Sequence, residues 1–204
     1  MKRAYIFGGG VYGNEFPVIS ENDFVIAADK GFEILKNKGI FPHITVGDFD
    51  SSSIIPEENV VILPVEKDVT DTFSAVNIAL EKGCSEIYVY GGMGGRPDHS
   101  FANYALLADL AQKGIRAYLV GEGYEITAVC NGRLSLSGKA GDTVSVFSFS
   151  EKSEGVSLYG LKYPLENSVL YNTFPLGVSN SLISEAAEIS VERGSLLVMQ
   201  EKRC

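Results

Sequence analysis

Two aspartates that directly follow a short apolar run have the spacing that most clearly suggests chemistry. The run Ile44–Val46 ends at Gly47, and Asp48 and Asp50 come next, separated by Phe49. In an extended chain, side chains two residues apart point to the same side, with Cα atoms roughly 6.5–7 Å apart. Two such carboxylates repel each other without a cation, and they suit Mg²⁺, which completes its shell with water and phosphates. Aspartate is also common in turns and helix caps, so both roles stay open.

Acidic residues also stand at two later junctions between an apolar run and a helical pattern. Asp68 and Asp71 lie where a helix to about Lys82 is expected, with Asp68 as N-cap and Asp71 at the capping-box position. Asp98 lies at the start of a longer helical pattern that runs to about Lys113. Each aspartate has a structural explanation by itself, but acidic residues at three such junctions together favour a binding site.

A glycine-rich segment supplies the opposite charge. Gly91–Gly95 is followed by Arg96 and by a helix start at Pro97. Glycine lets backbone N–H groups approach an anion, and a helix N-terminus adds partial positive charge. The planar guanidinium of Arg96 suits phosphate oxygens, Lys67 is a second cationic candidate, and His99 either contacts phosphate or caps the helix. Carboxylates, a positive cradle and a spare carboxylate beside a nucleophile are what phosphoryl-type transfer requires.

Short, continuous apolar runs alternate with helical patterns through the first part of the chain. Such runs are typical of parallel strands that are covered on both faces of the sheet. Asp29 and the residues discussed above directly follow strand ends, and open α/β sheets bind ligands at that edge. Strands are expected at 4–7, 24–28, 44–46, 59–63, 86–90 and 116–120, and helices at 31–38, 68–82 and 97–113.

The segment Gly8–Gly13 matches the Gly-x-Gly-x-x-Gly pattern of dinucleotide-binding loops. That pattern works only where a helix begins at the glycines and faces the pyrophosphate. Here Pro17 interrupts such a helix within its first turns. We therefore favour a glycine loop that lines some other nucleotide or phosphate.

The pattern changes from about Gly132, where helical periodicity ends and short runs with period-two stretches begin. In Val144–Phe149 the alternation changes phase after Val146, as a bulge would require. Strands are expected at 133–137, 143–150, 155–159, 168–171, 187–191 and 195–200. Short strands separated by turn signals predict a small antiparallel sandwich or barrel. The expected fold is thus α/β, with a mostly parallel sheet and helices on both faces over residues 1–127, followed by a smaller all-β sandwich over 128–204.

Composition excludes several classes of protein. A formal net charge of −9 argues against non-specific nucleic-acid binding, which needs a basic surface. No stretch reaches the roughly 20 apolar residues of a membrane span, and the N-terminal apolar run is too short for a signal peptide. Three widely spaced cysteines and two histidines indicate neither a disulfide framework nor a zinc site. We expect a protein of the reducing cytosol, without membrane or nucleic-acid partners.

Four motifs, in order along the chain, carry a family resemblance. They are Gly-Asp-Phe-Asp-Ser (47–51), Lys-Asp-Val-Thr-Asp-Thr (67–72), Gly-Gly-Met-Gly-Gly-Arg-Pro-Asp-His (91–99) and Gly-Val-Ser-Asn (177–180). Together they resemble the thiamine pyrophosphokinase family over essentially the whole chain. The resemblance implies an ATP-binding α/β catalytic domain, a thiamine-binding β-sandwich, and a homodimer with active sites at the subunit interface. It also implies transfer of the pyrophosphoryl group of ATP to the thiamine hydroxyl, giving thiamine diphosphate and AMP.

The resemblance also implies roles for individual residues. Mg²⁺ would be held by Asp48, Asp50 and Asp71. Asp98 would orient the thiamine hydroxyl or accept its proton, with Asp71 and Arg96 completing the catalytic set. Ser179 and Asn180 would contribute to the thiamine pocket. The nucleotide side would be formed by Asp29, Lys67, Asp68, Thr72, Gly92, Gly94, Gly95, Arg96 and His99.

One departure from the family concerns the residue that stacks on thiamine. Some relatives place a C-terminal tryptophan there, but this chain has no tryptophan. Phe174 and Tyr171 are the candidates for that role.

Two other functions are compatible with part of the pattern. A strand that runs into Asp-x-Asp also describes haloacid-dehalogenase-like phosphatases, in which the first aspartate is a covalent nucleophile. In that class the motif belongs to the first strand, and the loop at 91–99 would have no role. A non-catalytic sensor would bind ATP or thiamine without producing AMP, and binding alone does not need so many carboxylates.

Overall fold

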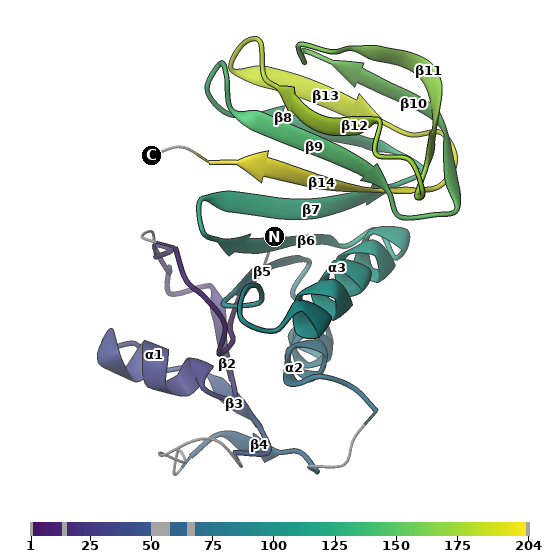
Figure 1. Cartoon of the computed structure of the whole chain (residues 1–204). Helices are drawn as coiled ribbons and strands as arrows, with labels where there is room; N and C mark the ends of the chain where they lie inside the picture. Colours follow the sequence, from purple (N-terminus) through teal and green to yellow (C-terminus); the bar gives the residue numbers. More distant parts are fainter. Residues whose placement is uncertain (1, 14–15, 50–57, 65–67, 203–204) are drawn as a thin grey trace. The chain divides into compact units, whose positions relative to one another are not determined.

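A computed structural model describes residues 2–13, 16–49, 58–64 and 68–202 of the chain (Figure 1). The chain forms two compact units, the first ending at Asn103 but including Leu119–Glu122. The second consists of Tyr104–Tyr118 and the chain from Gly123 onward. The division passes through one helix and one strand, and the domain boundary expected at residues 127/128 stays a prediction. No helix within the described residues is long and apolar enough to span a membrane.

Five parallel strands form the sheet of the first unit. Their order is β5-β1-β2-β3-β4, and every neighbouring pair is parallel. The strands β1, β2 and β3 are buried at every residue but the first because both faces of the sheet are covered, which is why their sequences are largely apolar. The strands are β1 (Arg3–Phe7), β2 (Phe24–Ala28), β3 (Ile44–Gly47), β4 (Val60–Ile62) and β5 (Glu86–Tyr90). The predicted parallel sheet is confirmed.

Helices cover both faces of this sheet. The helices are α1 (Gly31–Asn37), α2 (Asp71–Glu81) and α3 (Pro97–Gln112), and the strand β6 (Arg116–Gly121) follows them. Figure 1 shows α1 and α2 on opposite sides of the sheet, and α1 packs on β1 and β2. A Cβ atom added to Gly31 would lie 1.8 Å from the carbonyl oxygen of Phe7, so α1 can begin directly against the end of β1 only with glycine there.

The start of α2 differs from the prediction. Asp68 precedes the helix and is exposed, whereas the N-cap is Thr70, whose hydroxyl accepts a hydrogen bond from the backbone N–H of Phe73 at 3.2 Å. Asp71 is therefore the first helical residue, not the capping-box residue. Two good capping residues stand two positions apart in this sequence. With Thr70 as the cap, Asp71 places its negative charge in the first turn, at the positive end of the helix.

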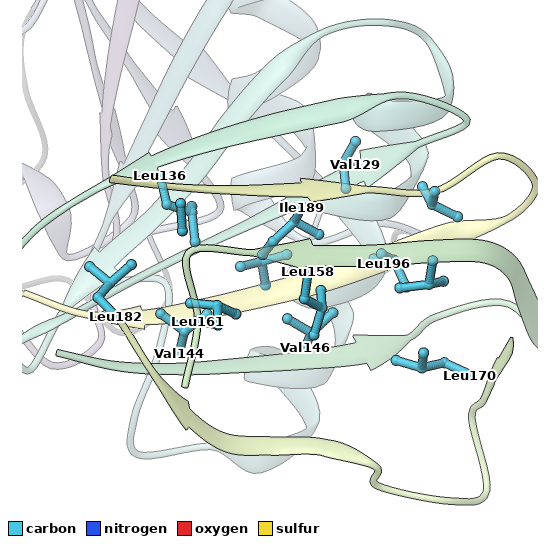
Figure 2. Packing of buried hydrophobic residues seen from close by; sticks show 14 residues of the cluster. Val129, Leu136, Val144, Val146, Leu158, Leu161, Leu170, Leu182, Ile189 and Leu196 are labelled. Carbon is cyan, nitrogen blue, oxygen red and sulfur yellow. The ribbon is translucent and has the colours of Figure 1, made fainter. Parts of the chain in front are cut away.

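The second unit contains two antiparallel sheets. One has the order β12-β9-β14-β7 and the other β11-β10-β13-β8. Apolar side chains from both sheets meet in one buried cluster, which includes Val146, Leu158, Ile189 and Leu196, all fully buried (Figure 2). The strands are β7 (Tyr124–Cys130), β8 (Arg133–Ser137), β9 (Thr143–Ser148), β10 (Lys152–Tyr159), β11 (Leu165–Tyr171), β12 (Gly177–Ser181), β13 (Ala186–Ser190) and β14 (Ser195–Glu201). The predicted all-β part is confirmed as a smaller antiparallel domain.

One detail of the second unit was predicted wrongly. The pairing of β9 with β14 runs from Val144 to Ser148 without a shift, and burial alternates regularly through Phe147, so no bulge occurs there. Ser148 takes the inward position because its hydroxyl is hydrogen-bonded to Ser153 at 2.8 Å. Register shifts lie instead in β12, between Gly177 and Asn180, and in the pairing of β10 with β11.

Candidate active site

A pocket of about 330 Å³ opens in the first unit where parallel strands end and helices begin. Residues after β1, β2 and β5 line it, together with the N-terminal residues of α2 and residues near the start of α3. Its lining comprises Gly8, Gly9, Gly10, Ala28, Asp29, Lys30, Thr70, Asp71, Thr72, Gly91, Gly92, Gly94, Gly95, Arg96, His99 and Asn103. Segments more than 90 residues apart in the sequence therefore meet at one sheet edge, as the order of elements predicted.

Two glycine segments form the floor of this pocket by continuing the β1–β5 pairing beyond the strands. The backbone N–H of Gly8 donates to the carbonyl of Tyr90 at 2.8 Å, and that of Gly10 donates to the carbonyl of Gly91 at 2.8 Å. A Cβ atom on Gly10 would lie 2.5 Å from the Gly91 carbonyl oxygen and 2.6 Å from that of Met93. Glycine is required at Gly10 because two backbones touch there. Residues 8–13 form no helix, in agreement with the preference against a dinucleotide loop.

The second glycine segment presents backbone donors. Within the described residues, no group accepts a hydrogen bond from the backbone N–H of Gly92, Gly94 or Gly95. Gly94 and Gly95 have φ values of +77° and +74°, a conformation that glycine adopts without strain. Together with the positive end of α3, which follows at Pro97, these N–H groups form an electropositive cradle for an anion.

Carboxylates and hydroxyls face the cradle from other elements. Asp29 follows β2 with φ +49°, a left-handed conformation that is uncommon outside glycine, and its N–H donates to the Val46 carbonyl at 2.8 Å. Asp71 and Thr72, at the start of α2, line the pocket as predicted. Asp29 and Asp71 thus bring carboxylates from two elements to one pocket.

The predicted metal ligands are only partly placed. Asp48 directly follows β3 and is half-buried, but it does not line the pocket; Asp50 and the cationic candidate Lys67 lie outside the described residues. Within the described part of the chain, no group of three or more histidine, cysteine or acidic residues could hold a metal ion. The donors that do line the pocket, the carboxylates of Asp29 and Asp71 and nearby hydroxyls, are hard oxygen ligands that fit Mg²⁺. The metal set therefore stays a prediction.

Arg96 and Asp98 form an exposed ion pair at the rim. The Arg96 Nε and Nη2 atoms lie 3.2 Å and 2.6 Å from the two carboxylate oxygens of Asp98, a bidentate arrangement. The hydrogen bonds from Arg96 lower the pKa of Asp98, and the same pair raises the pKa of Arg96. Arg96 and His99 line the pocket and Asp98 does not. The pair therefore places two opposite charges side by side at the rim of the pocket.

Several pocket residues were not identified from the sequence. Lys30 directly follows Asp29, and its place after a strand end could have been a signal. Asn103 is 4% exposed, lines the pocket, and donates from Nδ2 to the carbonyl of Gly92 at 2.7 Å. The available signal was its position four residues after His99, which places both residues on one face of α3.

The predicted thiamine residues lie in the second unit. Ser179 is exposed, has φ +58°, and occupies the irregular part of β12. Asn180 is 4% exposed, and its amide holds the backbone of Tyr163: Oδ1 accepts from Tyr163 N at 2.9 Å, and Nδ2 donates to Tyr163 O at 2.7 Å. Asn180 therefore fixes the chain around Ser179, and the role of both residues toward thiamine stays a prediction.

The two aromatic candidates for stacking also lie in the second unit. Tyr171 ends β11 and is 51% exposed, and Phe174 follows it at 62% exposed. Both rings are therefore accessible to a ligand, and neither is fixed in the buried core.

Comparison with known proteins agrees with the motifs. The family model described as "Thiamin pyrophosphokinase, catalytic domain" matches residues 17–119, and "Thiamin pyrophosphokinase, vitamin B1 binding domain" matches residues 133–196. A thiamine pyrophosphokinase of Bacillus subtilis is 30% identical over 212 residues, covering 98% of this chain and 99% of that protein.

Solved structures show the same architecture. A crystal structure of thiamine pyrophosphokinase from Bacillus subtilis superposes with a TM-score of 0.88 at 28% identity, covering 100% of both chains. A thiamin pyrophosphokinase family protein from Enterococcus faecalis superposes with a TM-score of 0.84 at 28% identity, covering 99% of this chain and 100% of that one.

Proposed function

The chain belongs to the thiamine pyrophosphokinase family, and from this premise we propose that it transfers the pyrophosphoryl group of ATP to the hydroxyl of thiamine. The hydroxyl oxygen forms a bond to the β-phosphorus of ATP while the bond from that phosphorus to the α-phosphate bridging oxygen breaks. AMP leaves with the electron pair of the broken bond on its phosphate oxygen, and the hydroxyl proton passes to solvent water. The observation that carries this proposal is the pocket in which unengaged glycine N–H groups face aspartates from other elements.

The glycine cradle is proposed to bind the polyphosphate of ATP. The N–H groups of Gly92, Gly94 and Gly95 supply donors that need no rearrangement, and such preorganised donors stabilise developing charge efficiently. Arg96 and Lys67 add positive charge, with Arg96 exchanging its contact with Asp98 for phosphate oxygens. That exchange is inexpensive because an exposed ion pair contributes little to stability.

The carboxylates are proposed to serve the metal. Asp71, at the first position of α2, would hold Mg²⁺ together with Asp48 and Asp50, and Asp29 would act on the nucleotide side. Bound there, Mg²⁺ would offset the negative charge of the phosphates and carboxylates. The protein's own contribution would be to bring these carboxylates together from the end of β2, the end of β3 and the start of α2.

Thiamine is a cation, so an acidic site attracts it. Asp98 is a carboxylate at neutral pH whether or not Arg96 stays paired with it, and it can accept a hydrogen bond from the thiamine hydroxyl and so orient it. Most of the acceleration would come from positioning and charge stabilisation, without a covalent intermediate. Ser179, on the segment fixed by Asn180, is the candidate contact from the second unit.

We further propose that the protein works as a cytoplasmic homodimer with active sites at the subunit interface. This follows the family resemblance, and light scattering of the purified chain would test the oligomeric state. A mass of one chain under assay conditions would contradict it.

One assay tests the proposed reaction. The chain is incubated with ATP, Mg²⁺ and thiamine, and AMP and thiamine diphosphate are expected in equal amounts. Inorganic phosphate released from simple phosphomonoesters would favour the phosphatase alternative. Binding of ATP and thiamine without AMP formation would favour the sensor alternative.

A further inference from the structure

Asn103 is a buried polar residue to which neither the motifs nor the proposed reaction assigns a role. It lies on α3 between the pocket and the rest of the first unit, and only 4% of its surface is exposed. Its Nδ2 donates to the carbonyl of Gly92, eleven residues earlier, at 2.7 Å. A buried amide that bonds to a loop carbonyl, and not to its own helix, holds the loop and the helix in one arrangement.

The peptide at Gly92 has little room to move. A Cβ atom at Gly92 would lie 2.9 Å from Val89 Cγ1, 3.1 Å from Leu119 Cδ2 and 3.3 Å from Asn103 Nδ2. Side chains from three other positions therefore lie close to the Gly92 backbone, and there is no room for a side chain at this position. The hydrogen bond from Asn103 fixes the direction of the carbonyl oxygen, which packing alone leaves open.

The direction of that carbonyl matters for an anionic ligand. A carbonyl oxygen carries partial negative charge and would repel a phosphate, whereas the following N–H groups attract one. We propose that Asn103 is a positioning residue: by binding the Gly92 carbonyl toward α3, it keeps the N–H groups of Gly94 and Gly95 available to the phosphates of ATP. This inference rests on the proposed function for the identity of the anion.

The test compares two changes at Asn103 with a matched control. Asn103→Ala removes the donor, and Asn103→Asp keeps the shape but replaces the donor by an acceptor with negative charge. Asn77→Ala, on the exposed face of α2, is the control because Asn77 does not line the pocket. For each variant we would measure the Kd of a non-hydrolysable ATP analogue with Mg²⁺, the KM values for ATP and thiamine, and unfolding in urea.

The expected result is selective for the nucleotide. Asn103→Ala should weaken analogue binding and raise the KM for ATP about tenfold, the size expected for one hydrogen bond. Asn103→Asp should weaken analogue binding further and raise the KM for ATP further, because its carboxylate repels both the Gly92 carbonyl and the phosphates. The KM for thiamine should stay within about twofold of the unsubstituted chain, and Asn77→Ala should change nothing.

Two results would overturn the proposal. One is analogue binding unchanged in both Asn103 variants. The other is an equal loss for ATP and thiamine, because a merely structural residue would affect both substrates alike. Analogue binding does not depend on turnover, so absence of AMP from the unsubstituted chain would refute the proposed reaction and leave the role of Asn103 decided by the Kd values alone.

Discussion

Two asparagines, one in each unit, have the same exposed fraction and different surroundings. Asn103 and Asn180 are each 4% exposed, and each binds the backbone of a neighbouring loop. Asn103 holds Gly92 beside a pocket, whereas Asn180 uses both ends of its amide to hold Tyr163 in the second unit. The same kind of hydrogen bond therefore holds a pocket loop in the first unit and the chain next to Ser179 in the second. We expect substitution of Asn103 to change nucleotide binding, and substitution of Asn180 to change mainly the free energy of unfolding.

The largest expected effect belongs to the pocket. Asp71→Asn should lower turnover by about 10²–10³-fold or more, because it removes a charge that faces the metal and phosphates. The fold should persist, since asparagine is tolerated in the first turn of a helix. Formation of AMP and circular dichroism would be measured together, with Glu81→Gln at the other end of α2 as the control. Near-normal turnover of Asp71→Asn would show that Asp71 is not a metal ligand.

The second-largest effect is expected on the free energy of unfolding, with nucleotide binding unchanged. Asn180→Ala removes both hydrogen bonds to the backbone of Tyr163. Because Tyr163 is 60% exposed, water can replace the lost partner, and at about 1 kcal/mol for each hydrogen bond we expect a loss of about 2 kcal/mol in the free energy of unfolding. Urea titration would measure it, with exposed Asn172→Ala as the matched control. A tenfold loss of affinity for the ATP analogue in Asn180→Ala would contradict the expectation that only Asn103 affects nucleotide binding.

A smaller effect tests the observed start of α2. Thr70→Ala should lower the free energy of unfolding by about 1 kcal/mol, because the hydroxyl no longer accepts from Phe73 N–H. Asp68→Ala should change it by less than about 0.5 kcal/mol, as is usual for exposed positions. Urea titration would measure both variants. A larger loss in the free energy of unfolding for Asp68→Ala than for Thr70→Ala would show that Asp68 is the N-cap.

The smallest effect on stability is expected at the rim of the pocket. Arg96→Gln removes the hydrogen bonds that lower the pKa of Asp98, so this pKa should rise toward its ordinary value. A carboxyl with a lowered pKa stabilises the folded state above its unfolded pKa, and this contribution is lost as the pH falls through the folded pKa. Both side chains are exposed, so unfolding should change little. An NMR titration of Asp98 in the free protein would show the shift, and an unchanged pKa would show that the ion pair does not form in solution.

The features that could be predicted from the sequence are those whose signals lie within one contiguous stretch of residues. Continuous apolar runs and the glycine segment at 91–95 are contiguous, so the parallel sheet and the pocket edge could be recognised directly. The choice of Thr70 over Asp68 as the N-cap of α2 could not be predicted, because both residues are good caps and tertiary packing decides between them. Strand β12 was missed because Gly177–Ser181 lacks a clear apolar alternation, and strand β7 because Tyr124–Cys130 lies where a boundary was expected.

The hydrogen bonds of the two asparagines could not be predicted from the sequence either, although the family resemblance named Asn180 as a thiamine residue. Asn103 and Gly92 are eleven residues apart, and Asn180 and Tyr163 seventeen, so each hydrogen bond depends on a fold that brings separate elements together. The burial and the hydrogen-bond partner of each asparagine become visible only in the fold.

The hydrogen bonds that join the two glycine segments limit how this site can be re-engineered. Gly8 donates to the last residue of β5, and Gly10 and Val11 donate to the segment after it, so neither half can be transplanted to another sheet without the other. A graft would have to carry two adjacent parallel strands in this register together with both loops. The smallest portable version of this anion-binding module is therefore a strand pair, not a peptide motif.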